Sequence, residues 1–257
     1  MIKTGIIGLG LIGGSIFKDL KKLGYDVIAV SNSQAGENIY KDYDKLKECE
    51  VIFVCSAMNK TLGILDKLES IISKDTIVTD VCSLKKFVSV NERPYKFIPS
   101  HPMAGTEHKG FENSFEELFK NATWVLTPFK NTDKQAIETL TKLIEQMGAK
   151  PIFTTPDKHD EAAAMISHMP MLIAQALFYA AKDSDLALTM ASSGFRDMTR
   201  LALSNEEMAC DMINMNHENI QTAILKLYKA VGELTSGNYP ELIANIKKQR
   251  SEMFIKK

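Results

Sequence analysis

The feature that most constrains the fold is a glycine-rich turn near the amino terminus. An apolar run at residues 2–7, typical of a buried strand, leads into Gly8-Leu9-Gly10-Leu11-Ile12-Gly13. The pattern at residues 14–23 then predicts a helix that Gly24 closes, and residues 26–31 predict a second strand. A GxGxxG string is a weak indication alone, but between a strand and a helix it is typical of a dinucleotide-binding βαβ unit.

The spacing of these glycines fits a bound pyrophosphate. Gly8 would form the tight turn, Gly10 would let the backbone approach the phosphates, and Gly13 would let the helix pack on the strand. The unpaired amides at the start of the helix would face the phosphates. We expect the cofactor to contact this turn and two serines after later strands: Gly8, Gly10, Leu11, Ile12, Gly13, Ser31 and Ser56.

The end of the second predicted strand leaves the choice of dinucleotide open. An NAD enzyme usually has an Asp or Glu there for the ribose 2′-hydroxyl, whereas this chain has Ser31-Asn32-Ser33. The missing carboxylate removes repulsion against a 2′-phosphate, but no arginine is nearby, and the next basic residue downstream is Lys41. We therefore expect NAD or NADP as the cofactor.

The rest of the first half alternates between strands and helices. Strands are predicted by β-rich runs at residues 51–55, 76–81, 97–100, 123–127 and 150–154, and helices by the patterns at residues 61–72 and 133–147. This alternation predicts an α/β fold with a Rossmann-type doubly wound sheet, which binds ligands outside the carboxyl ends of its strands. Ser56, Ser83 and His101 follow predicted strands, so we expect them along one crevice with the cofactor.

Residues 100–107 (SHPMAGTE) contain the strongest candidate for acid–base chemistry. Histidine can accept a proton near neutral pH, and Pro102 disfavours helical backbone at His101, so we expect His101 to be extended at a strand end. Gly105, Thr106 and Glu107 then form the kind of loop that cups a ligand. The alternative is a histidine that merely ends a strand.

The pattern changes after residue 154. Helices are predicted at residues 157–182, 185–203, 206–214, 218–235 and 240–254. We therefore expect a dinucleotide-binding domain at residues 1–154 and a helical domain at residues 155–257. Residues 220–234 keep one apolar face over several turns, and the domain is small, so we expect it to complete its core against a second copy of the chain.

Two stretches of the helical half carry side chains suited to a substrate. His159 and His168 are nine residues apart on one predicted helix, which puts them on roughly opposite faces, so we expect no metal pair. Arg196 and Arg200 are one turn apart with Asp197 beside them, which offers a fixed charged fork. The alternative for these arginines is a solvated, ion-paired helix.

Three segments together resemble the prephenate/arogenate dehydrogenase family of tyrosine biosynthesis. They are residues 79–85 (TDVCSLK), 100–105 (SHPMAG) and 192–200 (SSGFRDMTR). The similarity runs from Met1 to the last predicted helix. The resemblance implies oxidative decarboxylation of prephenate or arogenate with hydride transfer to NAD(P)+, and a homodimer formed through the helical domain.

The resemblance also implies roles for single residues. His101 would accept the proton of the ring hydroxyl as hydride departs, and Ser83 would assist by orienting His101 or the hydroxyl. The residues implied to bind substrate are Arg200, at a carboxylate, together with Thr106, Glu107 and His168. His168-Met169-Pro170 resembles the family's Ser-His-Leu-Pro segment, in which a second histidine commonly follows in prephenate-preferring relatives. Met171 stands there instead, so we expect measurable use of arogenate.

Composition argues against several other classes. Lys and Arg (31) nearly balance Asp and Glu (32), so the charge gives no case for a nucleic acid or an anionic membrane surface. Without a signal-peptide pattern or an apolar run near twenty residues, we expect a cytoplasmic protein. The four cysteines lack paired spacing, which predicts free thiols and no zinc site.

Two other functions fit the same fold. One is a dinucleotide-binding regulatory protein without turnover. The other is a different two-domain hydroxyacid or imine oxidoreductase, although such enzymes typically use a lysine of the helical domain, whereas this chain offers His101 and the segment ending at Arg200.

Overall fold

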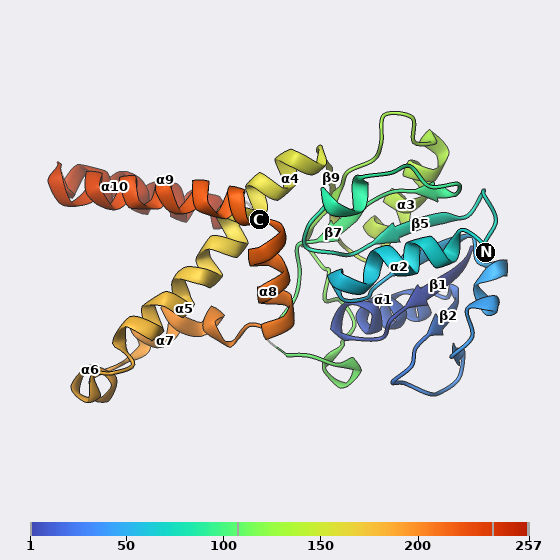
Figure 1. Cartoon of the computed structure of the whole chain (residues 1–257), viewed down its shortest axis with the longest axis horizontal. Coiled ribbons are helices and arrows are strands. Elements are labelled where there is room, and N and C mark those ends of the chain that lie inside the picture. Colours follow the sequence, from blue (N-terminus) through green and yellow to red (C-terminus); the bar gives the residue numbers. More distant parts are fainter. Residues whose placement is uncertain (1, 107, 238, 256–257) are drawn as a thin grey trace.

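The chain forms two sheets followed by an arm of helices (Figure 1). The computed structural model describes residues 2–106, 108–237 and 239–255. The first sheet is parallel, with the order β3-β2-β1-β4-β5-β6. Its strands are β1 (Lys3–Ile7), β2 (Asp26–Val30), β3 (Ile39–Tyr40), β4 (Val51–Val54), β5 (Ile77–Asp80) and β6 (Lys96–Phe97). Because this order is that of a dinucleotide-binding Rossmann domain, the predicted fold class is confirmed.

Helices cover both faces of this sheet. They are α1 (Leu11–Lys22), α2 (Met58–Leu68) and α3 (Lys134–Gln146), with short 3-10 turns at Tyr43–Glu48, Phe87–Ser89 and Phe111–Asn113. Along β4, Val51 and Phe53 pack in the cluster that contains α1 and α3, while Ile52 and Val54 pack in the cluster that contains α2. Burial on both faces explains why the predicted strands are continuously apolar rather than alternating.

The predicted strand at residues 97–100 is wrong, because the segment divides between two sheets. β6 ends at Phe97, and β7 (Ser100–Pro102) pairs antiparallel with β8 (Thr123–Leu126), which pairs in parallel with β9 (Lys150–Phe153). Pro99 lies at the division and has no N–H to continue a ladder. His101 is therefore extended, as predicted, but it lies within β7 opposite Val125 rather than beyond a strand of the first sheet.

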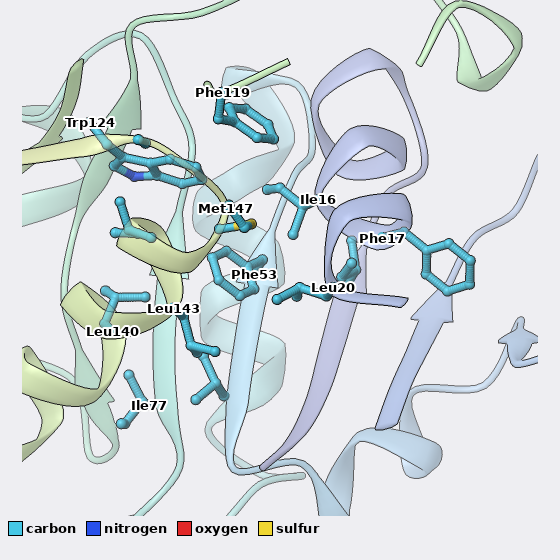
Figure 2. Close-up of a cluster of buried hydrophobic side chains, with 14 of the residues drawn as sticks. Ile16, Phe17, Leu20, Phe53, Ile77, Phe119, Trp124, Leu140, Leu143 and Met147 are labelled. Carbon is cyan, nitrogen blue, oxygen red and sulfur yellow. The ribbon is translucent and has the colours of Figure 1, made fainter. Parts of the chain in front are cut away.

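An apolar core joins the two sheets. Figure 2 shows Trp124 and Phe119 beside Phe53, with α1 and α3 contributing aliphatic side chains around them. Phe53, Phe119 and Trp124 are fully buried, and both other rings contact the Trp124 indole. Trp124 also donates from Nε1 to Ser100 Oγ at 2.9 Å, so this core extends to the residue before His101.

The second half of the chain is helical where the structure describes it. Its elements are α4 (Pro156–Ala163), a π-helical turn η4 (Ala164–His168), α5 (Met169–Ala181), α6 (Asp185–Thr189), α7 (Ser193–Thr199), a 3-10 turn η5 (Arg200–Leu203), α8 (Glu206–Met215), α9 (His217–Ser236) and α10 (Tyr239–Ile255). The predicted helix at residues 185–203 is wrong in its continuity, because Ser192 is extended and separates α6 from α7. The boundary that we propose after residue 154 falls between β9 and α4.

The helix formed by α4, η4 and α5 is longer and more apolar than expected, because the sequence pattern predicts no apolar run near twenty residues. Among the described residues, it alone is long and apolar enough to cross a membrane by length and composition, with a mean hydropathy of 1.3. Its inner face nevertheless carries the buried polar residues His159, Asp160 and His168, which hydrogen-bond to other parts of the protein. These contacts are those of a core helix.

The apolar face predicted at residues 220–234 is only half used within one chain. Ile220 and Ala223 are buried against η4 and α5, whereas Tyr228 and Val231 are exposed further along α9. Figure 1 shows α9 and α10 extending together away from the sheets. Exposed apolar side chains continue along α10 at Leu242, Ile243 and Ile246. Such a large apolar surface is typical of an interface.

Candidate active site

The glycine-rich turn has the shape that a pyrophosphate requires. Gly8 has a φ of +91°, and a Cβ there would lie 2.6 Å from the Cys55 carbonyl oxygen. A Cβ on Gly13 would lie 2.0 Å from the Gly8 carbonyl oxygen, so α1 packs on this turn only with glycine. Gly10 is different, because a Cβ there would meet nothing within 4 Å, and as the N-cap residue of α1 it has no side chain to cap the first amides. The backbone is therefore bare where a phosphate would sit.

The other predicted cofactor residues lie at the same edge. Leu11 and Ile12 form the first turn of α1 and are half-buried. Ser31 follows β2 and is buried, with its hydroxyl accepting the Gln34 N–H at 3.1 Å. Ser56 follows β4, and its Oγ lies 2.9 Å from Thr61 Oγ1. This edge of the sheet thus fits a dinucleotide.

A buried ion pair fixes the strand that carries His101. Lys85 and Asp80 are fully buried and paired, and Lys85 Nζ also donates to the Ser100 carbonyl at 2.5 Å. Asp80 Oδ1 accepts the Ser100 N–H at 3.2 Å, and Ser100 Oγ donates to the Asp80 carbonyl at 2.8 Å. The backbone of Ser100 is therefore held on both sides, immediately before His101. Sequence reasoning quoted Asp80 and Lys85 within the segment 79–85 but gave neither a role.

His101 heads a chain of polar side chains that reaches into the helical half. Its Nδ1 lies 2.9 Å from Nε2 of His159, and Nδ1 of His159 lies 2.7 Å from Asp160 Oδ1. The Asp160 carboxylate also accepts the backbone N–H groups of Lys85 at 2.7 Å and Lys86 at 2.9 Å. Within the described residues, Nε2 of His101 has no hydrogen bond. Sequence reasoning missed Asp160, although a histidine next to an aspartate at the start of a helix was visible.

His168 is the third histidine that the structure places in this region, after His101 and His159. Asn216 Nδ2 donates to the Asp160 carbonyl at 2.9 Å and to His168 Nδ1 at 3.1 Å. Because Nδ1 accepts, Nε2 of His168 carries the hydrogen, and among the described residues it is buried without a partner. The π-helical turn η4 lies between His159 and His168, so the regular α-helical count behind the prediction of opposite faces does not hold across it, and both side chains are buried.

Burial keeps both His101 and His168 neutral near pH 7. It lowers the pKa of His101 well below the ordinary 6.5, and the charge of the nearby Lys85 ammonium lowers it further. Burial also lowers the pKa of His168 to about 4, against an opposing contribution from Asp160. A neutral imidazole can accept a proton at one nitrogen while its other nitrogen donates.

The remaining predicted site residues lie outside this buried cluster. Ser83 is half-buried, and the contact that orients His101 comes from His159 rather than from Ser83. Thr106 is exposed and its hydroxyl accepts the His108 N–H at 3.2 Å, while Glu107 lies outside the described residues. Arg200 is exposed at the start of η5. The neighbouring Arg196 forms an exposed pair with Asp197 at 3.3 Å.

Neither a group of metal ligands nor the hollow at the other edge of the first sheet identifies the site. In the described part of the chain, no group of three or more His, Cys, Asp or Glu side chains could hold a metal ion. A hollow of about 470 Å³ opens at the opposite edge of the first sheet, beside Lys47, Ser73 and Gln135. That hollow lies at the amino ends of the strands, away from the glycine-rich turn and the histidines.

Comparison with known families matches both halves of the chain. The family model described as the nucleotide-binding domain of prephenate dehydrogenase matches residues 23–153. The model described as the dimerization domain of prephenate dehydrogenase matches residues 155–255.

Comparison with single proteins gives the same kind of relative. A prephenate dehydrogenase of Bacillus subtilis is 34% identical over 84% of this chain, and the match spans 64% of that relative's length. A cyclohexadienyl dehydrogenase of Zymomonas mobilis is 29% identical, with 82% of this chain and 80% of the relative covered.

Solved structures superpose over the whole chain. The arogenate dehydrogenase of Synechocystis is 32% identical, with 100% of both chains covered and a TM-score of 0.82. A prephenate dehydrogenase of A. aeolicus, in complex with hydroxyphenyl propionate and NAD+, is 28% identical, with 100% of this chain and 95% of that one covered and a TM-score of 0.82.

Proposed function

This chain belongs to the prephenate dehydrogenase family, and we propose that it catalyses the oxidative decarboxylation of prephenate, arogenate or both, with NAD+ or NADP+ as oxidant. The observation that carries the proposal is His101. It is neutral and oriented, and Nε2 has no hydrogen bond within the described residues. It lies in β7 directly after Ser100, which hydrogen-bonds to Asp80 at the carboxyl end of β5, and that end lies at the dinucleotide edge of the sheet.

The reaction requires few groups from the protein. Prephenate and arogenate are cyclohexadienes with a ring hydroxyl and, across the ring, a carboxylate. The dinucleotide, when bound at the glycine-rich turn, supplies the acceptor for a hydride from the hydroxyl-bearing carbon. His101 Nε2 takes the hydroxyl proton as the C=O bond forms. Loss of the ring carboxylate as carbon dioxide then aromatises the ring, which gives 4-hydroxyphenylpyruvate from prephenate or tyrosine from arogenate.

The substrate requires partners for its carboxylates. We propose that Arg200 binds one carboxylate and that His168, whose Nε2–H is buried without a partner among the described residues, donates a second hydrogen bond. Thr106 and Glu107 would line the mouth of the pocket, and Ser83 would contact the ring hydroxyl. Gly8, Gly10, Leu11, Ile12, Gly13, Ser31 and Ser56 would hold the dinucleotide.

The direct test follows nicotinamide reduction by its near-ultraviolet absorbance. Purified protein is mixed in turn with prephenate or arogenate and with NAD+ or NADP+. We expect reduction with at least one of the four combinations. A protein that binds the dinucleotide but reduces it with neither substrate would instead be a regulatory protein or an oxidoreductase for a different hydroxyacid or imine.

Arg200→Gln should raise the KM for the cyclohexadiene about ten-fold or more, while the KM for the dinucleotide changes little. The reason is that glutamine cannot replace a charge-assisted, bidentate hydrogen bond to a carboxylate. Steady-state kinetics with each substrate varied separately measure both constants. Arg196→Gln is the matched control, because Arg196 is an exposed, ion-paired arginine one turn earlier. If the substrate KM is unchanged, Arg200 belongs to a solvated, ion-paired helix and does not bind substrate.

We propose measurable use of arogenate, because Met171 stands where prephenate-preferring relatives commonly have a histidine. Met171 is buried with Met58, Cys82, Leu84, Ala209 and Met212. It offers no strong hydrogen bond to a keto group and places no imidazolium against an ammonium. Met171→His should shift the ratio of kcat/KM values toward prephenate. Met212→His, in the same apolar cluster, controls for the cost of burying a histidine. Use of prephenate alone by the wild type would contradict this proposal.

We also propose that the protein is a homodimer in the cytoplasm. The exposed apolar face of α9 and α10 supports the dimer, because a second copy would bury it. One chain has a mass of 28.7 kDa, and light scattering at micromolar concentration should give twice that mass. Tyr228→Glu, at an exposed position on α9, should shift the mass toward that of one chain. A monomeric wild type would refute the dimer and leave the proposed reaction untouched.

A further inference from the structure

Two buried residues of α4 have no part in the reaction as stated so far. Resting on the proposed function, we propose that His159 and Asp160 are positioning residues, which fix the hydrogen of His101 on Nδ1 and so leave Nε2 as the proton acceptor. Both residues are buried, and both belong to the helical half, whereas His101 belongs to the sheets. Figure 1 shows α4 at the junction between the two parts.

The hydrogens can be placed by starting from Asp160. Its two carboxylate oxygens accept the backbone N–H groups of Lys85 and Lys86, so the carboxylate acts as an acceptor at both positions. Nδ1 of His159, 2.7 Å from Oδ1, must therefore be the donor. We take the His159 ring to carry a single hydrogen; with that hydrogen on Nδ1, the other nitrogen carries a lone pair. Nε2 of His159 is thus an acceptor.

The same reasoning fixes His101. Since Nε2 of His159 accepts at 2.9 Å, Nδ1 of His101 must donate, and its single hydrogen is used there. The lone pair then remains on Nε2 of His101. The opposite placement would leave Nε2–H facing the substrate hydroxyl, and that form cannot accept a proton. The order of hydrogens along Asp160, His159 and His101 therefore decides whether His101 can act.

The hydrogen bonds from His101 through His159 to Asp160 also stabilise the state after proton transfer. When Nε2 of His101 takes the hydroxyl proton, the ring becomes a cation in a buried environment that disfavours charge. Its Nδ1–H still donates to His159, whose own N–H points to the Asp160 carboxylate. No other proton has to move. The Asp160 carboxylate stabilises the new positive charge, which is the role of a buried carboxylate behind a catalytic histidine.

The test compares three variants of the chain. His159→Leu removes the acceptor for the His101 Nδ1–H, and Asp160→Asn removes the charge and offers an amide donor to His159. Both should lower kcat at least about ten-fold with little change in the KM for the dinucleotide. His159→Gln places a carbonyl near the former Nε2 position and should recover part of the loss. Asp157→Asn is the matched control, because Asp157 lies one turn earlier on α4 and forms an exposed pair with Lys86 at 3.1 Å.

A nitrogen-15 spectrum of histidine-labelled protein reports the tautomer directly. The chain has five histidines, so single substitutions assign each ring. In the free wild-type protein at pH 7, we expect His101 to carry its hydrogen on Nδ1. In His159→Leu this preference should weaken, and in Asp157→Asn it should persist. The measurement needs neither substrate nor turnover, so it remains decisive if the protein reduces no dinucleotide with prephenate or arogenate.

Either of two results would overturn the proposal. One is a wild-type His101 with its hydrogen on Nε2. The other is a folded His159→Leu variant, by circular dichroism, with wild-type kcat and an unchanged pH profile. If His159→Leu fails to fold, the wild-type spectrum and the His159→Gln variant carry the test. If His159 only fills space, the tautomer of His101 stays the same in His159→Leu and in His159→Gln.

Discussion

Replacing His101 with asparagine should lower kcat by about two orders of magnitude or more, which is the contribution of a positioned acid–base group. An asparagine amide is not basic, so the hydroxyl proton would have to leave to water as the hydride departs. The fold and the affinity for the dinucleotide should persist, because the glycine-rich turn and the Ser100 contacts do not involve the imidazole. Steady-state kinetics and dinucleotide titration measure the two effects separately.

The pH dependence of the wild type follows from the sign of the pKa shift. A base acts while it is neutral, and burial lowers the pKa of His101 well below 6.5. The neutral form therefore persists at pH values where an exposed histidine would be protonated, and kcat/KM should stay high as the pH falls through 6.5. Activity should be lost only further down, as the pH reaches the lowered pKa.

Two outcomes would count against His101 as the base. One is full activity in His101→Asn. The other is an acid limb at the ordinary imidazole pKa. His217→Asn is the control, because His217 is an exposed histidine at the start of α9.

Lys85→Met should lower the free energy of unfolding by about 3–5 kcal/mol, the usual cost of leaving one partner of a buried ion pair without the other. Methionine is close to lysine in length, so the loss should come from the uncompensated Asp80 charge rather than from a cavity. The change would also remove the Nζ contact to the Ser100 carbonyl. Urea denaturation followed by circular dichroism measures the shift in midpoint.

The neighbouring lysine provides the control for this prediction. The Lys86 side chain is 73% exposed, and its pair with Asp157 lies in solvent. Lys86→Met should therefore leave the midpoint almost unchanged. Equal effects of the two substitutions would show that burial of the Asp80–Lys85 pair does not contribute to stability.

Local pattern was sufficient for the first half of the fold. The glycine-rich turn, the strands on either side of it and the apolar runs of β4 and β5 lie where the sequence predicts them, because each is set by neighbouring residues. α1 begins at Leu11 rather than at residue 14, which is a difference of one turn. The prediction of one strand at residues 97–100 was wrong, because this β-rich run passes from the first sheet to the second without a break in its composition.

The site was harder to predict because it depends on contacts that are distant in sequence. His101 and His159 are 58 residues apart, and Lys85 and Asp160 are 75 apart. The π-turn η4 also changes the phase of the helix by an amount that a regular α-helical count does not include. Residues 79–85 and 100–105 stand out as segments in the sequence, but only packing shows that their buried members Asp80, Lys85 and Ser100 hold the backbone beside His101.

The hydrogen bond from Trp124 to Ser100 matters to anyone who would engineer this protein. Trp124 lies in the middle of the core beside Phe53 and Phe119, and its indole also holds the residue before His101 (Figure 2). A redesign that repacks this core for heat resistance would also move the backbone before His101, the proposed base, and a misplacement of about 1 Å can lower turnover about 100-fold. We therefore expect substitutions at Phe53, Phe119 and Trp124 to change thermostability and turnover together, so libraries at these positions should be screened for both.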